Sequence, residues 1–308
     1  MLDSDCLSLI LSKVSYVDNL SFRLTSKNNK SISLPNFKDI FIKRLLKHHI
    51  VPSYENALLF CDNLYATGAY VAGSFILDCL YDTNYHQDID IYDQTNLVGS
   101  INEENLMNNR FYKFGDGNLR FTQSLYELGF KSIGSNSGKN LTLRYFLHKT
   151  YENFDKHIIM KYDNQEQFLK TINEKIQIIP ISLTHFGNER SFIPRFISAS
   201  FDLEICQNTF NGEKLNIKNL DKLIYKYDFI KPNTRFMLAI YPHNFNEHKN
   251  TLTETRMKKY IERGFNIKPH PDYDEIDNFI KNILKSNKYS NNIKYIDNGE
   301  IDLSKYDY

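Results

Sequence analysis

Two carboxylates that alternate with isoleucines are the side chains of this sequence best suited to chemistry. Asp88 and Asp90 flank Ile89, and Ile91 follows. Successive side chains of a strand point to opposite faces, so a strand here buries both isoleucines and places both carboxylates on the other face. Adjacent carboxylates repel each other unless a cation lies between them. The natural partner is a hard ion such as Mg²⁺, which in turn binds phosphates.

A pair of small residues, Gly73-Ser74, closes an apolar run shortly before these carboxylates. The sequence predicts a short helix from Phe75 to Tyr81 directly after the pair. A serine at a helix start accepts one backbone N–H and leaves others free for phosphate, while a glycine lets the backbone approach a ligand closely. The two features together predict a phosphate site next to a cation site.

A third carboxylate, Asp202, lies between two apolar residues in the segment 200–205, where polar and apolar residues alternate. We expect a strand that places Asp202 and Glu204 on one face. The segment 175–179 also reads as a strand and is expected to pair with it. Because the interval between Asp90 and Asp202 is long, one or more insertions must loop out of the fold.

Gly-Ser, a short helix and Asp-x-Asp on the next strand resemble the signature of the nucleotidyltransferase superfamily with the polymerase-beta-type fold. The resemblance implies that Gly73 and Ser74 hold a nucleoside triphosphate, that Asp88 and Asp90 bind two Mg²⁺ ions, and that Asp202 completes the metal site. The implied reaction moves a nucleoside monophosphate to an acceptor hydroxyl and releases pyrophosphate. Taken singly, Gly-Ser is uninformative and Asp-x-Asp is usually a solvated strand face, and fold alone leaves open whether catalysis is retained.

Three apolar stripes at helical spacing precede this core in residues 1–48. Helices this short bury too little surface to be stable alone, so the unit needs a partner or the neighbouring domain. The segment resembles an F-box in its Ile10-Leu11 pair, in Asp18-Asn19-Leu20 and in the run from Arg23 to Lys27, although Asp3 stands where that family usually has proline.

The F-box resemblance implies docking to a Skp1-type adaptor of a cullin ubiquitin ligase through Leu7, Ile10 and Leu11. It supports a second hypothesis, a catalytically inactive adaptor that links a target to the ligase. The simpler alternative is a helical cap packed on the next domain.

The composition narrows the classes of partner. The 308 residues carry 38 basic and 37 acidic side chains, a net charge of +1, which gives no strong signal for nucleic-acid binding. Apolar runs are too short for a membrane span, and the four cysteines lack metal-site spacing and read as buried free thiols. We therefore expect an intracellular protein without a membrane partner.

The sequence predicts an α+β fold with four parts. These are an F-box-like helical segment (1–48), a nucleotidyltransferase-like core with a mixed sheet (49–210), a helical C-terminal part (211–285) and a polar, mobile tail (286–308). A Gly- and Ser-rich stretch, 131–139, predicts the tip of a hairpin, and a basic helix from Arg256 is expected to end at Gly264 with its charges on a solvated face.

The whole arrangement resembles a group of proteins encoded by large DNA viruses of the giant-virus type. Two short matches carry this resemblance, the run from Phe201 to Cys206 and the tripeptide Arg263-Gly264-Phe265. It implies a place in the host-cell cytoplasm.

Overall fold

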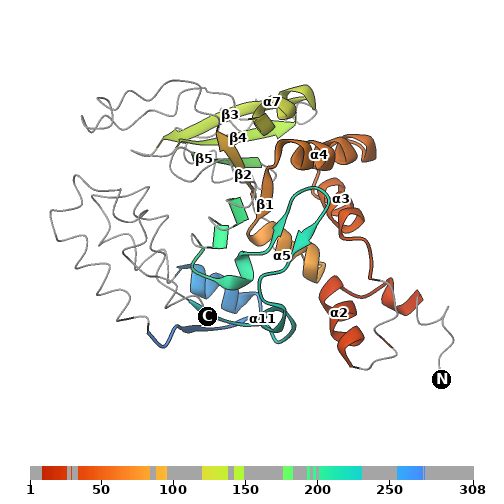
Figure 1. Cartoon of the computed structure of the whole chain (residues 1–308), viewed down its shortest axis with the longest axis vertical. Helices are drawn as coiled ribbons and strands as arrows, with labels where there is room; N and C mark the ends of the chain where they lie inside the picture. The colour runs from red at the N-terminus through yellow and green to blue at the C-terminus, as the bar shows by residue number, and fades with distance from the viewer. Residues whose placement is uncertain are drawn as a thin grey trace.

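A mixed seven-stranded sheet organises the chain, with strand order β3-β4-β5-β2-β1-β6-β7 (Figure 1). The computed structural model describes residues 9–25, 29, 34–83, 88–95, 120–137, 142–148, 176–182, 193–194, 197–198, 201–230, 255–272 and 274. Helices and strands both contribute to this part of the chain, which confirms the expected α+β class.

The N-terminal helices begin at side chains that accept backbone N–H groups. The bounds are α2 (Tyr16–Leu24), α3 (Phe37–Lys47) and α4 (Tyr54–Thr67). Ser15, Asn36 and Ser53 cap them, because each side chain accepts an N–H that has no carbonyl partner inside the helix. The helices predicted from the second and third apolar stripes are thus present.

The centre of the sheet comes from two strands joined by a helix: β1 (Tyr70–Ala72), α5 (Ser74–Tyr81) and β2 (Ile89–Thr95). β1 runs antiparallel to β2. The next elements are α7 (Arg120–Glu127), β3 (Phe130–Ser137), β4 (Thr142–His148) and β5 (Ile176–Ser182). β3 and β4 form a hairpin as predicted, but residues 131–137, which were expected at its tip, belong to strand β3. β5 lies parallel to β2.

The later elements close the other edge of the sheet and add a small second sheet. They are η3 (Glu204–Cys206), β6 (Thr209–Phe210), β7 (Leu215–Asn216), α11 (Leu220–Ile224), β8 (Tyr227–Ile230), a helix over 255–262 and β9 (Asn266–Pro269). β6 pairs antiparallel with β1, and β8 pairs parallel with β9.

Two predictions about this half of the chain are wrong. Of the segment 200–205, the described residues 201–205 form a bend and the start of the 3-10 helix η3 instead of a strand. β5 therefore pairs with β2 and β4 and not with that segment. The part 211–285, expected to be helical, contains the strands β7, β8 and β9 as well as α11 and the helix over 255–262.

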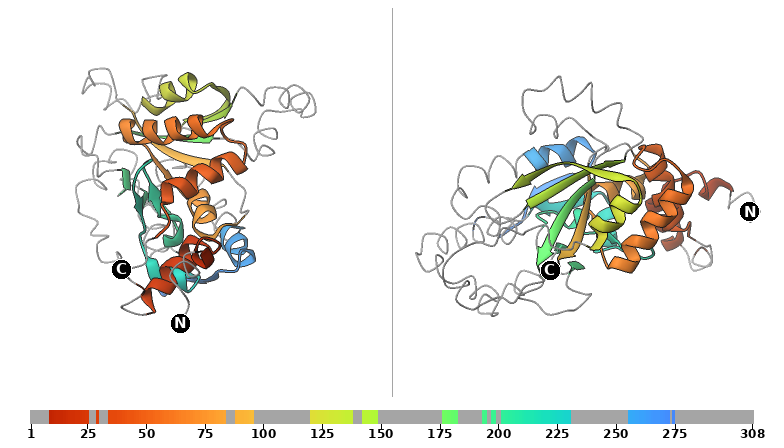
Figure 2. Two further views of the ribbon diagram at one scale, coloured as in Figure 1. Left: turned by 90° about the vertical axis from the view of Figure 1, so that its right-hand side faces the viewer. Right: turned by 90° about the horizontal axis from the view of Figure 1, so that it is seen from above.

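One face of the sheet carries the main core, against α4 and α7. Several of its rings pack edge to face, an arrangement that aromatic pairs prefer; the ring centroids of Phe60 and Phe121, for example, lie 5.3 Å apart. Phe37, Phe41 and Leu45 of α3 belong to the same cluster. The hydrophobic core is therefore continuous across the predicted boundary at residue 48, and Figure 2 shows α3 and α4 beside the sheet and away from the blue helix over 255–262.

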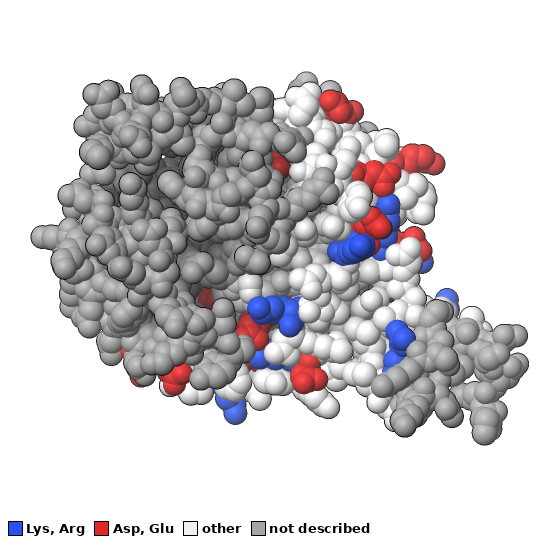
Figure 3. Space-filling view, viewed as in Figure 1, with Lys and Arg blue, Asp and Glu red and all other residues white. Residues whose placement is uncertain are grey.

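The described surface mixes charges of both signs. In the view of Figure 3, coloured Lys and Arg side chains lie next to Asp and Glu. Among the described residues, no helix combines the length and apolar character that a membrane crossing requires. Two predicted features lie outside those residues: Leu7 and the tail 286–308.

Candidate functional site

Gly73 brings the predicted site residues together at the junction of β1 and α5. Its backbone angles are φ 81° and ψ −150°, a conformation open essentially to glycine alone. A Cβ at this position would lie 3.1 Å from Asp90 Oδ2 and 3.7 Å from Cζ of Phe201. The missing side chain thus allows the backbone at the start of α5 to touch a carboxylate.

Asp90 sits on β2 with the orientation that its neighbours dictate. Ile89 and Ile91 are fully buried in the main core, so Asp90 points to the opposite face. This confirms the predicted alternation. Asp88 directly precedes β2, and both carboxylates are partly buried.

Ser74 is the first residue of α5 and is itself buried, 8 % exposed. The first N–H groups of any helix have no carbonyl partner within that helix, and the helix dipole places positive charge there. The Gly73 N–H is already committed, since it donates to the carbonyl of Cys206 at 3.1 Å. The turn begins at Gly73, whose Cβ position lies 3.1 Å from Asp90 Oδ2.

Asp202 occupies a different position from the one predicted. It is 3 % exposed and lies in the bend before η3, where Arg256 Nη1 approaches its Oδ1 at 2.7 Å. The strand position opposite Asp90 is instead Gln177 of β5. The third carboxylate therefore reaches this region from a loop, with a guanidinium already bound to it.

The helix over 255–262 supplies the positive charge of the site. Arg256, Lys259 and Arg263 recur at helical spacing on one side of it, and Tyr260 lies between them with its ring 5.7 Å from Lys259 Nζ and 5.0 Å from Arg263 Cζ. This face was expected to be solvated. The spacing of the three cations was the available sequence signal, but it does not reveal which acid they meet.

Burial sets the protonation of these groups. Desolvation lowers the pKa of Lys259 to about 8; the charges of Arg263 and Arg256 act in the same direction, and the charge of Asp90 opposes them. Desolvation raises the pKa of Cys206 to about 12, and its Sγ lies 3.0 Å from the hydroxyl of Tyr260. Cys206 is thus a neutral structural thiol, whereas Lys259 can exchange a proton near neutral pH.

A buried ion triad holds the loop that carries Asp202. Lys222 Nζ lies 2.7 Å from Glu204 Oε2 and 2.7 Å from Asp228 Oδ1. Asp228 also accepts the N–H of Ile205 at 2.9 Å. Glu204, predicted to share a face with Asp202, therefore binds η3 to α11 and β8 and takes no part in the candidate site.

Asp93 is a further carboxylate that sequence reasoning passed over. It is fully buried on the core face of β2, and its Oδ2 accepts the N–H of Phe121 at 3.0 Å in the first turn of α7. This contact is a helix cap and fixes α7 on the sheet. Asp93 lies two residues beyond Ile91 in β2. Its side chain therefore points to the same face as Ile91, opposite to the face of Asp90.

Two of the three residues predicted to bind an adaptor are described, and they differ in exposure. Ile10 is 48 % exposed, whereas Leu11 is 8 % exposed and faces the interior. Leu7 falls outside the described residues.

The described His, Cys, Asp and Glu side chains include no group of three or more that could hold a metal ion. A scan against protein-family models finds no match, and searches of curated proteins and of solved structures find none either. The residues of this site are therefore the basis for assigning a function.

Proposed function

We propose that the protein is a nucleotidyltransferase-type enzyme that binds a nucleoside triphosphate with Mg²⁺ and transfers the nucleoside monophosphate to an acceptor hydroxyl. The observation that carries the proposal is the tight space at Gly73, directly before α5, where an added Cβ would lie 3.1 Å from Asp90 Oδ2. Phosphate donors and a cation-binding carboxylate are there side by side, which is what a metal–phosphate complex requires.

The donor set fits magnesium. Mg²⁺ is usually held by one or two carboxylates together with water and substrate phosphates, so Asp88 and Asp90 suffice without a third protein ligand. When bound, the ion would neutralise the phosphates and stabilise the charge that develops on the attacking and leaving oxygens. Asp88 and Asp90 hold it, and the backbone of Ser74 orients the triphosphate.

Arg256 and Asp202 are assigned linked roles. Arg256 is 40 % exposed in its side chain, so it can turn from Asp202 to a bound triphosphate. That exchange frees the buried Asp202 carboxylate, which then accepts the proton of the acceptor hydroxyl as its oxygen attacks the α-phosphorus. The bond to the leaving pyrophosphate breaks in the same displacement.

The test combines binding with turnover. The melting temperature of the full chain is measured with each of the four nucleoside triphosphates, with and without Mg²⁺, for the wild type, for Asp90→Asn and for the control Asp62→Asn on the exposed surface of α4. Pyrophosphate release is followed in the same samples. We expect a Mg²⁺-dependent rise of several degrees that Asp90→Asn abolishes and Asp62→Asn retains.

Two results would contradict the proposal at different points. A nucleotide shift that survives Asp90→Asn would place the nucleotide elsewhere. A wild-type protein that gains no stability from any nucleotide and releases no pyrophosphate would remove the enzymatic function.

A second candidate function is that of a non-enzymatic adaptor, favoured by exposed apolar side chains near the N-terminus. Leu9, Ile10, Val14 and Leu24 are 65 %, 48 %, 39 % and 55 % exposed. Single exposed apolar residues are common, but several within one short segment are typical of a binding surface. Co-purification with a Skp1-type adaptor should be lost in Ile10→Asp and retained in Leu59→Asp, which alters an equally exposed leucine of α4; equal behaviour of the two variants would reject this role.

A further inference from the structure

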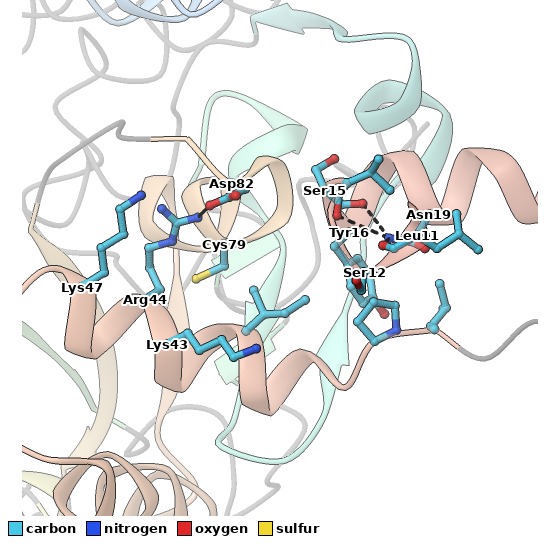
Figure 4. A pocket seen from close by; sticks show the side chains of 14 residues that line it. Leu11, Ser12, Ser15, Tyr16, Asn19, Lys43, Arg44, Lys47, Cys79 and Asp82 are labelled. Carbon is cyan, nitrogen blue, oxygen red and sulfur yellow. Dashed lines mark hydrogen bonds and ion pairs between the residues drawn. The ribbon is translucent and has the colours of Figure 1, made fainter. Parts of the chain in front are cut away.

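A cavity separate from the candidate site opens between the N-terminal segment and α3. Its volume is about 430 Å³, within the range of small-molecule sites, roughly 300–1,000 Å³. Figure 4 shows its two sides: Lys43, Arg44, Lys47 and Asp82 come from α3 and the end of α5, and Ser12, Ser15 and Tyr16 lie on the other side. The side chains of Lys43 and Lys47 point in different directions from α3.

The α3 side carries an excess of positive charge. Arg44 is 4 % exposed and is held in place, because its guanidinium donates to the carbonyl of Thr83 at 2.6 Å and pairs with the carboxylate of Asp82. Asp82 is thereby neutralised. Lys43 and Lys47, one helical turn apart, have no ion pair within the described part of the chain, so the cavity keeps two uncompensated ammonium groups.

The polar groups opposite do not neutralise this charge. Ser12 donates its hydroxyl hydrogen to the carbonyl of Leu9, and Ser15 donates to Asp18. The amide nitrogen of Asn19 donates to the carbonyl of Leu11 at 2.9 Å. These contacts fix the wall. The one carboxylate among them, Asp18, does not line the cavity.

Apolar side chains complete the lining. Val14, Leu34, Pro35 and Ile40 contribute to it alongside the lysines. A cavity of this kind suits a ligand with an anionic head and an apolar body, since burying the body contributes free energy that a bare ion cannot gain.

We propose that this cavity binds a small organic phosphate, with the phosphate at Lys43 and Lys47 and an apolar ring or chain against Pro35 and Ile40. Two flexible ammonium groups suit phosphate as point charges, and Arg44 supports the wall without being consumed by the ligand. The site lies at α3 and the end of α5, and it is independent of the proposed nucleotide transfer at Gly73 and Asp90.

A matched pair of fluorescent probes tests the charge dependence in the full chain. 1-Anilinonaphthalene-8-sulfonate carries an anionic head on an apolar body, and N-phenyl-1-naphthylamine is the same body without the charge. We expect the sulfonate to bind at least tenfold more tightly than the neutral probe, and phenyl phosphate to displace it. Lys43→Gln/Lys47→Gln should remove the tenfold preference. Lys38→Gln should keep it, because Lys38 lies on the same helix α3 but is paired with Asp62 of α4.

Several outcomes overturn the proposal. Equal binding of the sulfonate by the wild type and the double variant would show that Lys43 and Lys47 do not bind the anionic group. Displacement by an acidic peptide but not by phenyl phosphate would make the cavity a peptide-docking site instead. Both altered lysines are exposed, so unchanged near-ultraviolet circular dichroism confirms the fold, and Asp90→Asn should bind both probes as the wild type does.

Discussion

At the scale of single residues, the candidate site depends on the absence of a side chain at Gly73. Gly73 combines a backbone conformation that side chains avoid with a close approach to Asp90. Gly68, at the end of α4, also has a positive φ of 75°, yet a Cβ there would meet nothing within 4 Å. A side chain at Gly73 would therefore meet both a more strained backbone and less space than one at Gly68.

Gly73→Ala should destabilise the protein by about 3 kcal/mol, because strain of this kind costs roughly 1–3 kcal/mol and the new methyl group also presses on Asp90. Gly68→Ala should cost only about 1 kcal/mol, since it meets the strain of a left-handed helix end alone. Urea denaturation of both variants measures the difference. Equal losses would mean that the contact with Asp90 is not tight.

Lys259 gives the site a pH dependence. Its pKa in the folded protein, about 8, lies below that of an unfolded lysine, near 10.5, so keeping it charged costs stability below pH 8. Lys259→Met should therefore raise the free energy of unfolding at pH 7, by on the order of 1 kcal/mol. The gain should shrink as the pH rises from 8 to 10.5.

The control is Lys258→Met, which alters the exposed neighbour on the same helix and should show no such trend. Both series are measured without nucleotide. A gain for Lys259→Met that stays constant between pH 7 and pH 10.5 would show that Lys259 is solvated in the folded protein.

At the scale of elements, the loop with Asp202 is fixed by charges that arrive from later in the chain. Glu204 and Asp228 are 4 % and 1 % exposed, and Lys222 is the cation between them. Desolvation raises the pKa of Asp228, while its contacts with Lys222 and two backbone N–H groups oppose that shift. The triad therefore joins η3, α11 and β8 only while Lys222 is present.

Lys222→Met should destabilise the protein by about 3–5 kcal/mol at pH 7, since it leaves two carboxylates buried without a counter-charge. The loss should diminish below about pH 5, where the carboxylates can take up protons. Lys38→Met removes the exposed pair with Asp62 and should cost less than about 1 kcal/mol. A loss for Lys222→Met no larger than for Lys38→Met would show that the triad contributes little.

The same loop shows where prediction from the sequence stops. Local periodicity was enough to predict α3 and the two faces of β2, because apolar residues recur at helical spacing in α3 and Ile89 and Ile91 alternate with the acids in β2. The alternation from Phe201 to Ile205 is equally regular, yet it forms a bend and η3. Its acids are bound by Lys222 and Arg256, and pairing with such distant cations leaves no mark on the local pattern.

At the scale of the whole molecule, the N-terminal helices belong to the core of the sheet. α2 packs against α5 and α11, and Phe37, Phe41 and Leu45 of α3 are buried with Phe60 and Phe210. Phe41 and Phe210 lie only 4.7 Å apart between ring centroids. Function and folding therefore cannot be assigned to residues 1–48 and 49–308 separately.

A protein that lacks residues 1–48 should fail to fold cooperatively, since each large apolar side chain removed from a core costs about 2–5 kcal/mol and several are lost together. Calorimetry should show no sharp transition. Removal of residues 1–8 alone deletes no described core residue and should leave the transition in place. A sharp, unshifted transition after removal of residues 1–48 would show that the helices are an independent unit.

The ion pair between Asp202 and Arg256 has a consequence for biosynthesis. The ribosome releases the chain from its N-terminus, so Gly73, Asp90 and Asp202 all emerge well before the helix over 255–262. During that interval Asp202 lacks the guanidinium of Arg256. A chain whose translation stops before residue 255 can pair β1 with β2, yet it leaves Asp202 without its guanidinium. The candidate site is thus complete only after the helix over 255–262 has been synthesised. A prematurely terminated chain can form the β1–β2 pair without the ion pair between Asp202 and Arg256.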